Sequence, residues 1–236
     1  MTQTCPRFAI YYAPEPTEFL ATRARVWLGY DAETGNATQQ PAVARFGAER
    51  LRHLTAEPRR YGFHGTLKPP FGLAAGMTES MLIEAVRAFC AAQPPVRVGP
   101  IRVAAISDFI ALVPAGDGAD VAALAAACVR QFDAFRAVPG AVELARRRAA
   151  GLTPRQDELL RRWGYPYVME EFRFHLTLTG KVTDEDRSVL LPALGEMFAS
   201  EKIGPVTARG LAVFKQPAAE EPFRVLARVP FAGQAT

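Results

Sequence analysis

Two short segments combine a histidine with a threonine two residues later, and they lie 111 residues apart in a chain of 236 residues. One reads Phe63-His64-Gly65-Thr66-Leu67 and the other reads Phe174-His175-Leu176-Thr177-Leu178. Each consists of an aromatic residue, a histidine, any residue, a threonine and a leucine. The chain has three histidines, and these segments use two of them. We interpret the two segments as facing parts of one site.

The chemistry that two such pairs support is in-line displacement at phosphorus. An imidazole titrates near neutral pH, with an unperturbed pKa of about 6.5, so one histidine accepts a proton while the other donates one. A threonine hydroxyl on the same face donates a hydrogen bond to a non-bridging phosphate oxygen and stabilises its charge without a metal. We therefore predict four catalytic residues: His64, Thr66, His175 and Thr177. The pattern leaves open which histidine is the base.

The periodicity of a β-strand predicts which other side chains share the cleft, because alternate side chains point to the same face. A strand from about residue 60 to residue 70 places Arg60 and Lys68 on the face of the first pair. A second strand places Arg173 and Thr179 beside the second pair. Aromatic residues that could stack on a base lie close to the second segment. The predicted substrate-binding residues are Lys68, Arg173, Thr179 and Tyr167.

The sequence offers no spacing of His, Cys or acidic residues that is typical of a metal site, so we expect no metal and no cofactor. Three scattered cysteines argue against a disulfide framework and favour a reducing cytoplasm. His53 is interpreted as a surface or packing residue. No apolar run approaches the roughly 20 residues that cross a bilayer, and the N-terminal segment does not resemble a signal peptide. We expect a cytoplasmic protein with no membrane partner.

Alternating and helical hydrophobic patterns predict the elements around the two segments. Strands are predicted at 8–13, 96–106, 108–113, 206–216 and 223–229. Helices are predicted from a cap at Thr17 to about residue 28, at 47–54, from a cap at Thr78 to about 93, and from a cap at Thr183 to about 200. Each His-x-Thr segment is thus followed by a capped helix and then by strands.

The spacing of these elements indicates an internal repeat. Thr78 precedes Gly99 by 21 residues, and Thr183 precedes Gly204 by 21 residues. A Gly-Pro dipeptide between apolar residues occurs at both places, at 99–100 and 204–205. We predict one bilobal domain over residues 1–236, with repeated units at about 60–114 and 171–230.

A helical insertion is predicted between the repeats, at about 118–163. Thr153 and Gln156 form a capping box with Pro154 at the first helical position. Eight arginines fall between residues 130 and 162, in a chain whose formal net charge is +4. Such a run most often forms a solvated helix face, and the alternative is that some of its arginines reach a phosphate in the cleft.

The paired motifs resemble those of the two-histidine (2H) phosphoesterase superfamily, which includes RNA 2′,5′-ligase-like and cyclic phosphodiesterase proteins. Within it, the chain is similar to a bacterial family of unknown function (DUF1045-like) that is associated with phosphonate-utilisation operons. The similarity rests on the segments at 60–71, 144–148 and 163–180. It implies an α+β fold with a pseudo-two-fold axis, in which two antiparallel sheets form a central cleft with helices outside. It also implies the two His-x-Thr pairs as a metal-free active site.

The resemblance implies a cyclic phosphodiesterase acting on a small phosphorylated sugar or nucleotide. The phosphonate association suggests a ribose 1,2-cyclic phosphate that carries a 5-phosphate, and a nucleoside 2′,3′-cyclic phosphate is the other candidate. Two alternatives stay open: RNA 2′–5′ ligation or RNA end processing, and a non-catalytic module that binds nucleotides or RNA. RNA therefore remains an alternative partner, and the oligomeric state is left open.

Overall fold

One antiparallel sheet runs through the centre of the protein in the computed structural model, which describes residues 5–149 and 151–232. Within these ranges the strand order is β11-β10-β1-β4-β8-β7-β6. The strands are β1 (Arg7–Tyr12), β4 (Gly65–Gly72), β6 (Ile101–Ile106), β7 (Phe109–Pro114), β8 (Leu176–Thr177), β10 (Gly210–Gln216) and β11 (Arg224–Pro230). The mixed α+β class is confirmed. The expectation of two separate sheets is wrong, because a backbone pair between Gly65 and Leu176 joins β4 to β8.

Two small two-stranded sheets accompany the central one. β2 (Tyr30–Asp31) pairs with β3 (Asn36–Ala37), and β5 (Val96–Gly99) pairs with β9 (Val206–Ala208). The second pair brings the two Gly-Pro segments together, since Gly99 is aligned with Val206. The two segments are therefore in contact, and the internal repeat itself stays a prediction.

The helices begin and end largely where capping residues predict. They are α1 (Phe19–Leu28), α2 (Ala48–Leu54), α3 (Ala56–Tyr61), α4 (Glu79–Ala91), α5 (Ala119–Gln131), α6 (Ala141–Arg148), α7 (Pro154–Trp163), α8 (Asp184–Met197) and α9 (Ser200–Ile203). The hydroxyls of Thr78 and Thr183 cap α4 and α8 as expected, and the capping box at Thr153 is present. The cap expected at Thr17 is wrong, because a turn closed by Glu18 N–H and the carbonyl of Glu15 precedes the helix.

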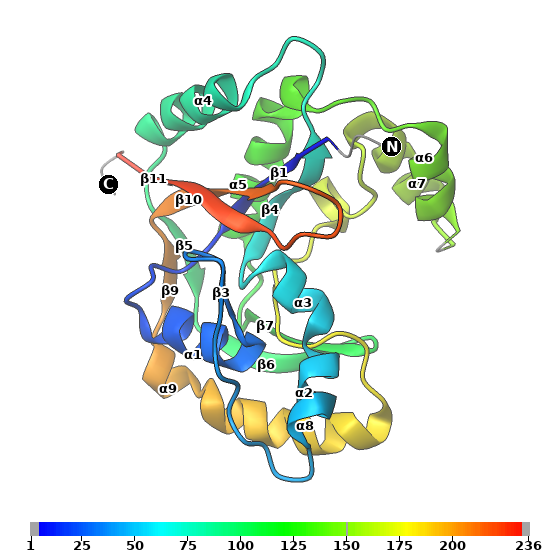
Figure 1. Ribbon diagram of the computed structural model, residues 1–236. Helices are drawn as coiled ribbons and strands as arrows, with labels where there is room; N and C mark the ends of the chain where they lie inside the picture. The colour runs from blue at the N-terminus through cyan, green and yellow to red at the C-terminus, as the bar shows by residue number, and fades with distance from the viewer. Residues whose placement is uncertain (1–4, 150, 233–236) are drawn as a thin grey trace.

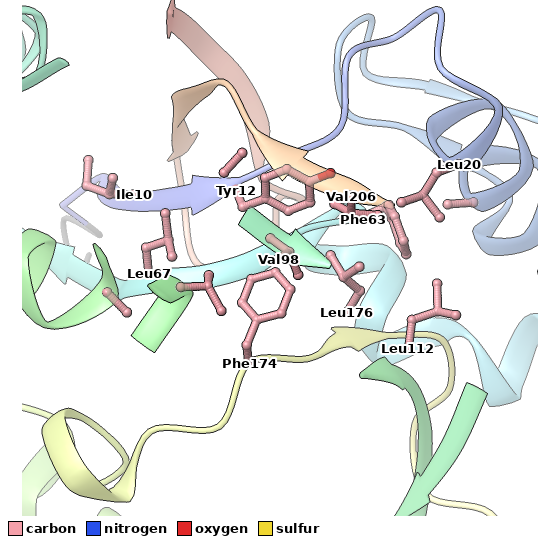
Figure 2. Close-up of a cluster of buried hydrophobic side chains, with 14 of the residues drawn as sticks. Ile10, Tyr12, Leu20, Phe63, Leu67, Val98, Leu112, Phe174, Leu176 and Val206 are labelled. Carbon is pink, nitrogen blue, oxygen red and sulfur yellow. The ribbon is translucent and has the colours of Figure 1, made fainter. Parts of the chain in front are cut away.

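The main core lies on one face of the sheet, against α1, α4, α5 and α8. β1 shows the alternation that divides the two faces: Phe8, Ile10 and Tyr12 enter the main core, whereas Ala9 and Tyr11 enter a smaller cluster on the other face. Figure 2 shows part of the main core, with the ring of Phe174 directed toward Tyr12. The second face is therefore free to carry a site.

The region at 118–163 is divided between the core and the surface. α5 packs against β4 and β5 and buries Val121, Leu124 and Cys128 in the main core. α6 and α7 instead lie together at one side of the molecule (Figure 1), joined by an ion pair between Arg148 and Asp157. The predicted insertion thus begins with a core helix.

None of the helices in the described ranges combines the length and hydropathy needed to cross a bilayer.

Candidate active site

A cavity of about 490 Å³ lies at the face of the sheet that the main core leaves uncovered. His64 and Thr66 line it from the start of β4, and His175 and Thr177 line it from β8. The four residues predicted from the two segments are therefore brought together around one space. A catalytic role for them remains a prediction.

The backbone pair between Gly65 and Leu176 explains how the two segments meet. These are the middle residues of the two His-x-Thr segments. Because the strands are antiparallel, extending their register by one residue in each direction sets His64 opposite Thr177 and Thr66 opposite His175. Each histidine therefore faces the threonine of the other segment as well as sharing a face with its own.

His64 is held on three sides. Its Nδ1 lies 2.9 Å from the carbonyl oxygen of Gly62, and its Nε2 lies 3.0 Å from Oγ1 of Thr66. The ring also stacks on Tyr11 with 3.7 Å between centroids. Because a carbonyl only accepts, Nδ1 carries the proton, and in the neutral ring Nε2 accepts from the Thr66 hydroxyl. The Thr66 hydroxyl thus donates a hydrogen bond to His64 in this structure, and it donates to a phosphate only after that hydrogen bond is broken.

His175 repeats part of this arrangement. Its Nδ1 lies 2.8 Å from the carbonyl oxygen of Arg173, again two residues upstream, and its ring lies 5.6 Å from that of Phe109. Among the residues that the structure describes, none forms a hydrogen bond with its Nε2, and none bonds the hydroxyl of Thr177. The same tautomer is therefore fixed in both rings, but His175 and Thr177 keep free polar groups at the cavity.

The two histidines differ in how strongly their surroundings oppose a positive charge. The pKa of His64 is lowered to about 4, mainly by burial; the Gly62 carbonyl opposes this shift and the nearby His175 adds to it. Burial also lowers the pKa of His175, against the opposing effect of the Arg173 carbonyl. Both imidazoles are thus neutral at pH 7 in the free protein.

Two glycines make this geometry possible. Gly62 has φ 73° and ψ 169°, a backbone conformation that is open to glycine almost alone, and it presents the carbonyl that holds His64. A Cβ on Gly65 would lie 2.5 Å from the ring of Phe174. The first motif therefore needs a glycine between its histidine and its threonine for space, whereas Leu176 fills the same place in the second motif.

Lys68 does not lie in the cavity, so this part of the prediction is wrong. β4 is irregular beside β1: Thr66 is aligned with Tyr11, but Lys68 is aligned with Ile10. One extra residue in β4 reverses the alternation, as a β-bulge does. Lys68 therefore enters the opposite side, where it is 1% exposed and its Nζ donates to the carbonyl of Val129 and to Asp133.

The other predicted binding residues contribute less than expected. The side chain of Arg173 is exposed and does not line the cavity, because β8 begins only at Leu176 and the strand alternation does not extend back to it. Tyr167 is 44% exposed, and its neighbour Tyr165 lines the cavity in its place. Thr179 borders the cavity, but its hydroxyl oxygen accepts the N–H of Ile110 at 2.9 Å.

Several lining residues were outside the predicted set of site residues. Tyr11 and Arg7 come from β1, where Arg7, Ala9 and Tyr11 share a face. Strand alternation alone indicates that these three residues share a face, but only the pairing of β1 with β4 shows that this face borders the site. Arg60 lines the cavity from α3 rather than from a strand, and Arg146 and Arg147 line it from α6.

No three His, Cys, Asp or Glu side chains come close enough to hold a metal ion within residues 5–149 and 151–232. Metal independence is a statement about the reaction, and it stays a prediction.

Comparisons with known proteins find one family model, described as "Protein of unknown function (DUF1045)", which matches residues 66–224. The chain is 38% identical over 237 residues to ribose 1,5-bisphosphate phosphokinase PhnN of Janthinobacterium sp. (strain Marseille), covering 99% of this chain and 52% of that protein. It is 34% identical over 220 residues to the protein of the same name from Laribacter hongkongensis (strain HLHK9), covering 93% and 50%. The chain thus spans about half the length of these curated relatives.

Among solved structures, the crystal structure of TT0787 of Thermus thermophilus is 13% identical with a TM-score of 0.44, over 97% of this chain and 100% of that one. A likeness this distant adds nothing to the description of the fold or of the site.

Proposed function

The chain belongs to the DUF1045 family of proteins of unknown function, and we propose that it is a metal-independent cyclic phosphodiesterase that opens a small cyclic phosphate ester. The proposal rests on one observation: the rings of His64 and His175 are held by the same kind of hydrogen bond. In each ring Nδ1 bonds the carbonyl two residues upstream, which leaves Nε2 as the atom that exchanges protons. Two such rings beside one cavity suit proton transfer on both sides of a phosphorus atom.

We assign the base role to His64 and the acid role to His175. His64, with the pKa lowered to about 4, is the neutral base that takes a proton from the attacking water. His175, when its ring is charged, is the acid whose Nε2–H protonates the leaving oxygen. The water oxygen forms a bond to phosphorus. The bond between phosphorus and the leaving oxygen of the cyclic ester breaks, and that oxygen receives the proton from His175. When His64 becomes charged, its Nε2–H donates to Thr66, and the Thr66 hydroxyl is then free to donate to a phosphate oxygen. Thr177 donates from the other side.

The substrate we propose is a ribose 1,2-cyclic phosphate that carries a 5-phosphate, as the phosphonate-operon association of the family suggests. Breaking its bond between phosphorus and O2 leaves phosphates on C1 and C5, which is ribose 1,5-bisphosphate. This is the compound in the name of the relatives, each of which is about twice the length of the matched region. A hydrolase that forms this compound beside a kinase that consumes it would explain two halves in one protein.

We assign the kinase activity in the relatives' name to the half of those proteins that this chain does not match. The 236-residue sequence contains no G-x-x-x-x-G-K-[ST] segment, the loop that cradles nucleotide phosphates in one large class of kinases. The cavity instead carries two neutral imidazoles, which serve proton transfer. We therefore propose hydrolysis, and not phosphorylation, for this chain.

The test offers the purified protein, in EDTA, ribose 1,2-cyclic phosphate 5-phosphate, adenosine 2′,3′-cyclic phosphate and an RNA ending in a 2′,3′-cyclic phosphate, with products followed by ³¹P NMR. Wild type is expected to open the ribose compound to the 1,5-bisphosphate. His64→Ala and His175→Ala are expected to lose at least about 10²-fold in kcat, and Thr177→Val about tenfold. Arg155→Gln, at a site away from the cavity, is the control. Absence of ring opening by wild type, or equal rates in the histidine variants, would refute the proposal.

A further inference from the structure

The charge around the cavity exceeds what one phosphodiester needs. Its charged lining residues are Arg7, Arg60, Arg146, Arg147 and Lys181, with Glu57 and Asp108. Lys181 pairs with Asp108 at 2.9 Å, and Arg147 pairs with Glu143 at 2.8 Å. Within the part of the chain that the structure describes, the remaining three arginines form no ion pair with a carboxylate. A cyclic phosphodiester brings a single negative charge, so this excess favours a second anionic group.

Arg147 carries a polar group whose partner is missing from the protein. Its side chain is 17% exposed, and its Nε is buried without a hydrogen-bond partner in the described residues. Its guanidinium lies over the ring of Tyr165, 5.1 Å from the centroid, which fixes its position at the wall. A buried donor without an acceptor lowers stability, by about 1–3 kcal/mol for such groups in general. An anionic ligand would supply the acceptor.

Arg7 lines the same cavity and is also held in place. Its Nε donates to Oε1 of Gln216 at 2.7 Å, and Gln216 is itself 1% exposed and donates to the carbonyl of Glu221. Only one side of the Arg7 guanidinium is used in this way. Arg7 and Tyr165 both lie near enough to the hydroxyl of Tyr11 to influence its pKa, while the Tyr11 ring stacks on His64. Arg7 and Tyr165 therefore lie near Tyr11, whose ring stacks on the proposed base.

We propose that Arg7 and Arg147 bind a second phosphate of the substrate, a terminal monoester, in the part of the cavity lined by Tyr11 and Tyr165. This inference rests on the proposed function and narrows its substrate class to cyclic esters with a further phosphate. A phosphate monoester carries between about −1.5 and −2 charges near pH 7 and accepts bidentate bonds from guanidinium groups. It therefore matches the excess of arginines and provides an acceptor for the buried Nε.

The test compares kcat/KM for ribose 1,2-cyclic phosphate with and without the 5-phosphate. Wild type is expected to prefer the 5-phosphorylated compound at least about 100-fold, from two charged contacts. Arg147→Gln and Arg7→Gln are each expected to reduce this preference at least about tenfold, mainly through KM. Arg148→Gln is the matched control, because Arg148 neighbours Arg147 on α6 but pairs with Asp157 away from the cavity. Equal rates of wild type on the two compounds, or an unchanged preference in both variants, would overturn the subsite.

Calorimetric titration with ribose 5-phosphate separates this inference from the reaction itself. Wild type and Arg148→Gln are expected to bind it alike, and Arg147→Gln and Arg7→Gln at least about tenfold more weakly. If neither cyclic ester is opened but this pattern holds, the proposed reaction is wrong and the subsite stands. Equal affinity in all four correctly folded proteins, as judged by circular dichroism, would refute the subsite.

Discussion

Gly65 and Leu176 form a backbone pair across β4 and β8, and each is the middle residue of a His-x-Thr segment. One pair of residues therefore fixes where both histidines and both threonines lie. Because Gly65 has no side chain, the ring of Phe174 packs directly over its backbone, 2.5 Å from the position that a Cβ would take. Both the register of the site and the packing of the core therefore depend on Gly65.

Replacing Gly65 by alanine is expected to disturb both the packing of the core around Phe174 and the register of the site. The ring of Phe174 is buried and has little room to move, so overpacking should lower the free energy of unfolding by about 1–3 kcal/mol and shift His64 relative to His175. Gly72→Ala in the same strand is the control, since nothing lies within 4 Å of its Cβ position. Urea denaturation and kcat measure the two effects. A Gly65→Ala protein as stable and active as Gly72→Ala would contradict this account.

The pH dependence of kcat/KM should be bell-shaped, with its maximum on the acid side of neutrality. The base must be unprotonated, so activity should rise through pH 4, which is about the pKa of His64. The acid must be protonated, so activity should fall as the pH rises through the pKa of His175, which burial lowers from 6.5. Initial rates between about pH 3.5 and 8, in a range where circular dichroism shows intact structure, test this. Activity that keeps rising above pH 7 would reverse or exclude the assignment of base and acid.

Stability should also depend on pH through His64. Its pKa is about 4 when folded and about 6.5 when unfolded, so below pH 6.5 the unfolded chain binds a proton that the folded protein does not. The stabilisation is present above pH 6.5 and is lost as the pH falls toward 4. Between about pH 7 and 4.5, wild type is expected to lose about 2–2.5 kcal/mol more than His64→Gln. Urea denaturation measures it, with His53→Gln, an exposed histidine on α2, as control. Parallel losses in wild type and His64→Gln would contradict the prediction.

Lys68→Met distinguishes the observed position of Lys68 from the cleft position that simple alternation predicts. Lys68 is buried against α5, with its pKa lowered to about 8 by burial, and Asp133 keeps Arg136 as a partner at 2.8 Å when the lysine is removed. Because Arg136 keeps the Asp133 carboxylate paired, removing the lysine leaves no unpaired charge, so stability should change by less than about 1 kcal/mol and activity by less than about twofold. A tenfold loss of kcat/KM without loss of stability would place Lys68 back in the site.

Local features of the protein follow from residue types and short-range spacing. Side-chain hydroxyls at Thr78, Thr153 and Thr183 start helices because they satisfy backbone N–H groups within the same few residues. Alternation predicted the strands on either side of the motifs, and the repeated His-x-Thr pattern identified the four residues that now line one cavity. Each of these depends on interactions between residues close in the chain or on residue type alone.

Long-range packing sets which face of a strand each side chain takes and which distant residues line the cavity. The extra residue in β4 that turns Lys68 away is visible only in the register against β1. Arg7 and Arg147 are 140 positions apart, and no local pattern relates them; strand pairing and the packing of α5, α6 and α7 bring them to one cavity. The carbonyls of Gly62 and Arg173 fix the histidine tautomers through backbone geometry. Residue types thus indicated the proposed chemistry, whereas non-local packing set which side chains line the cavity.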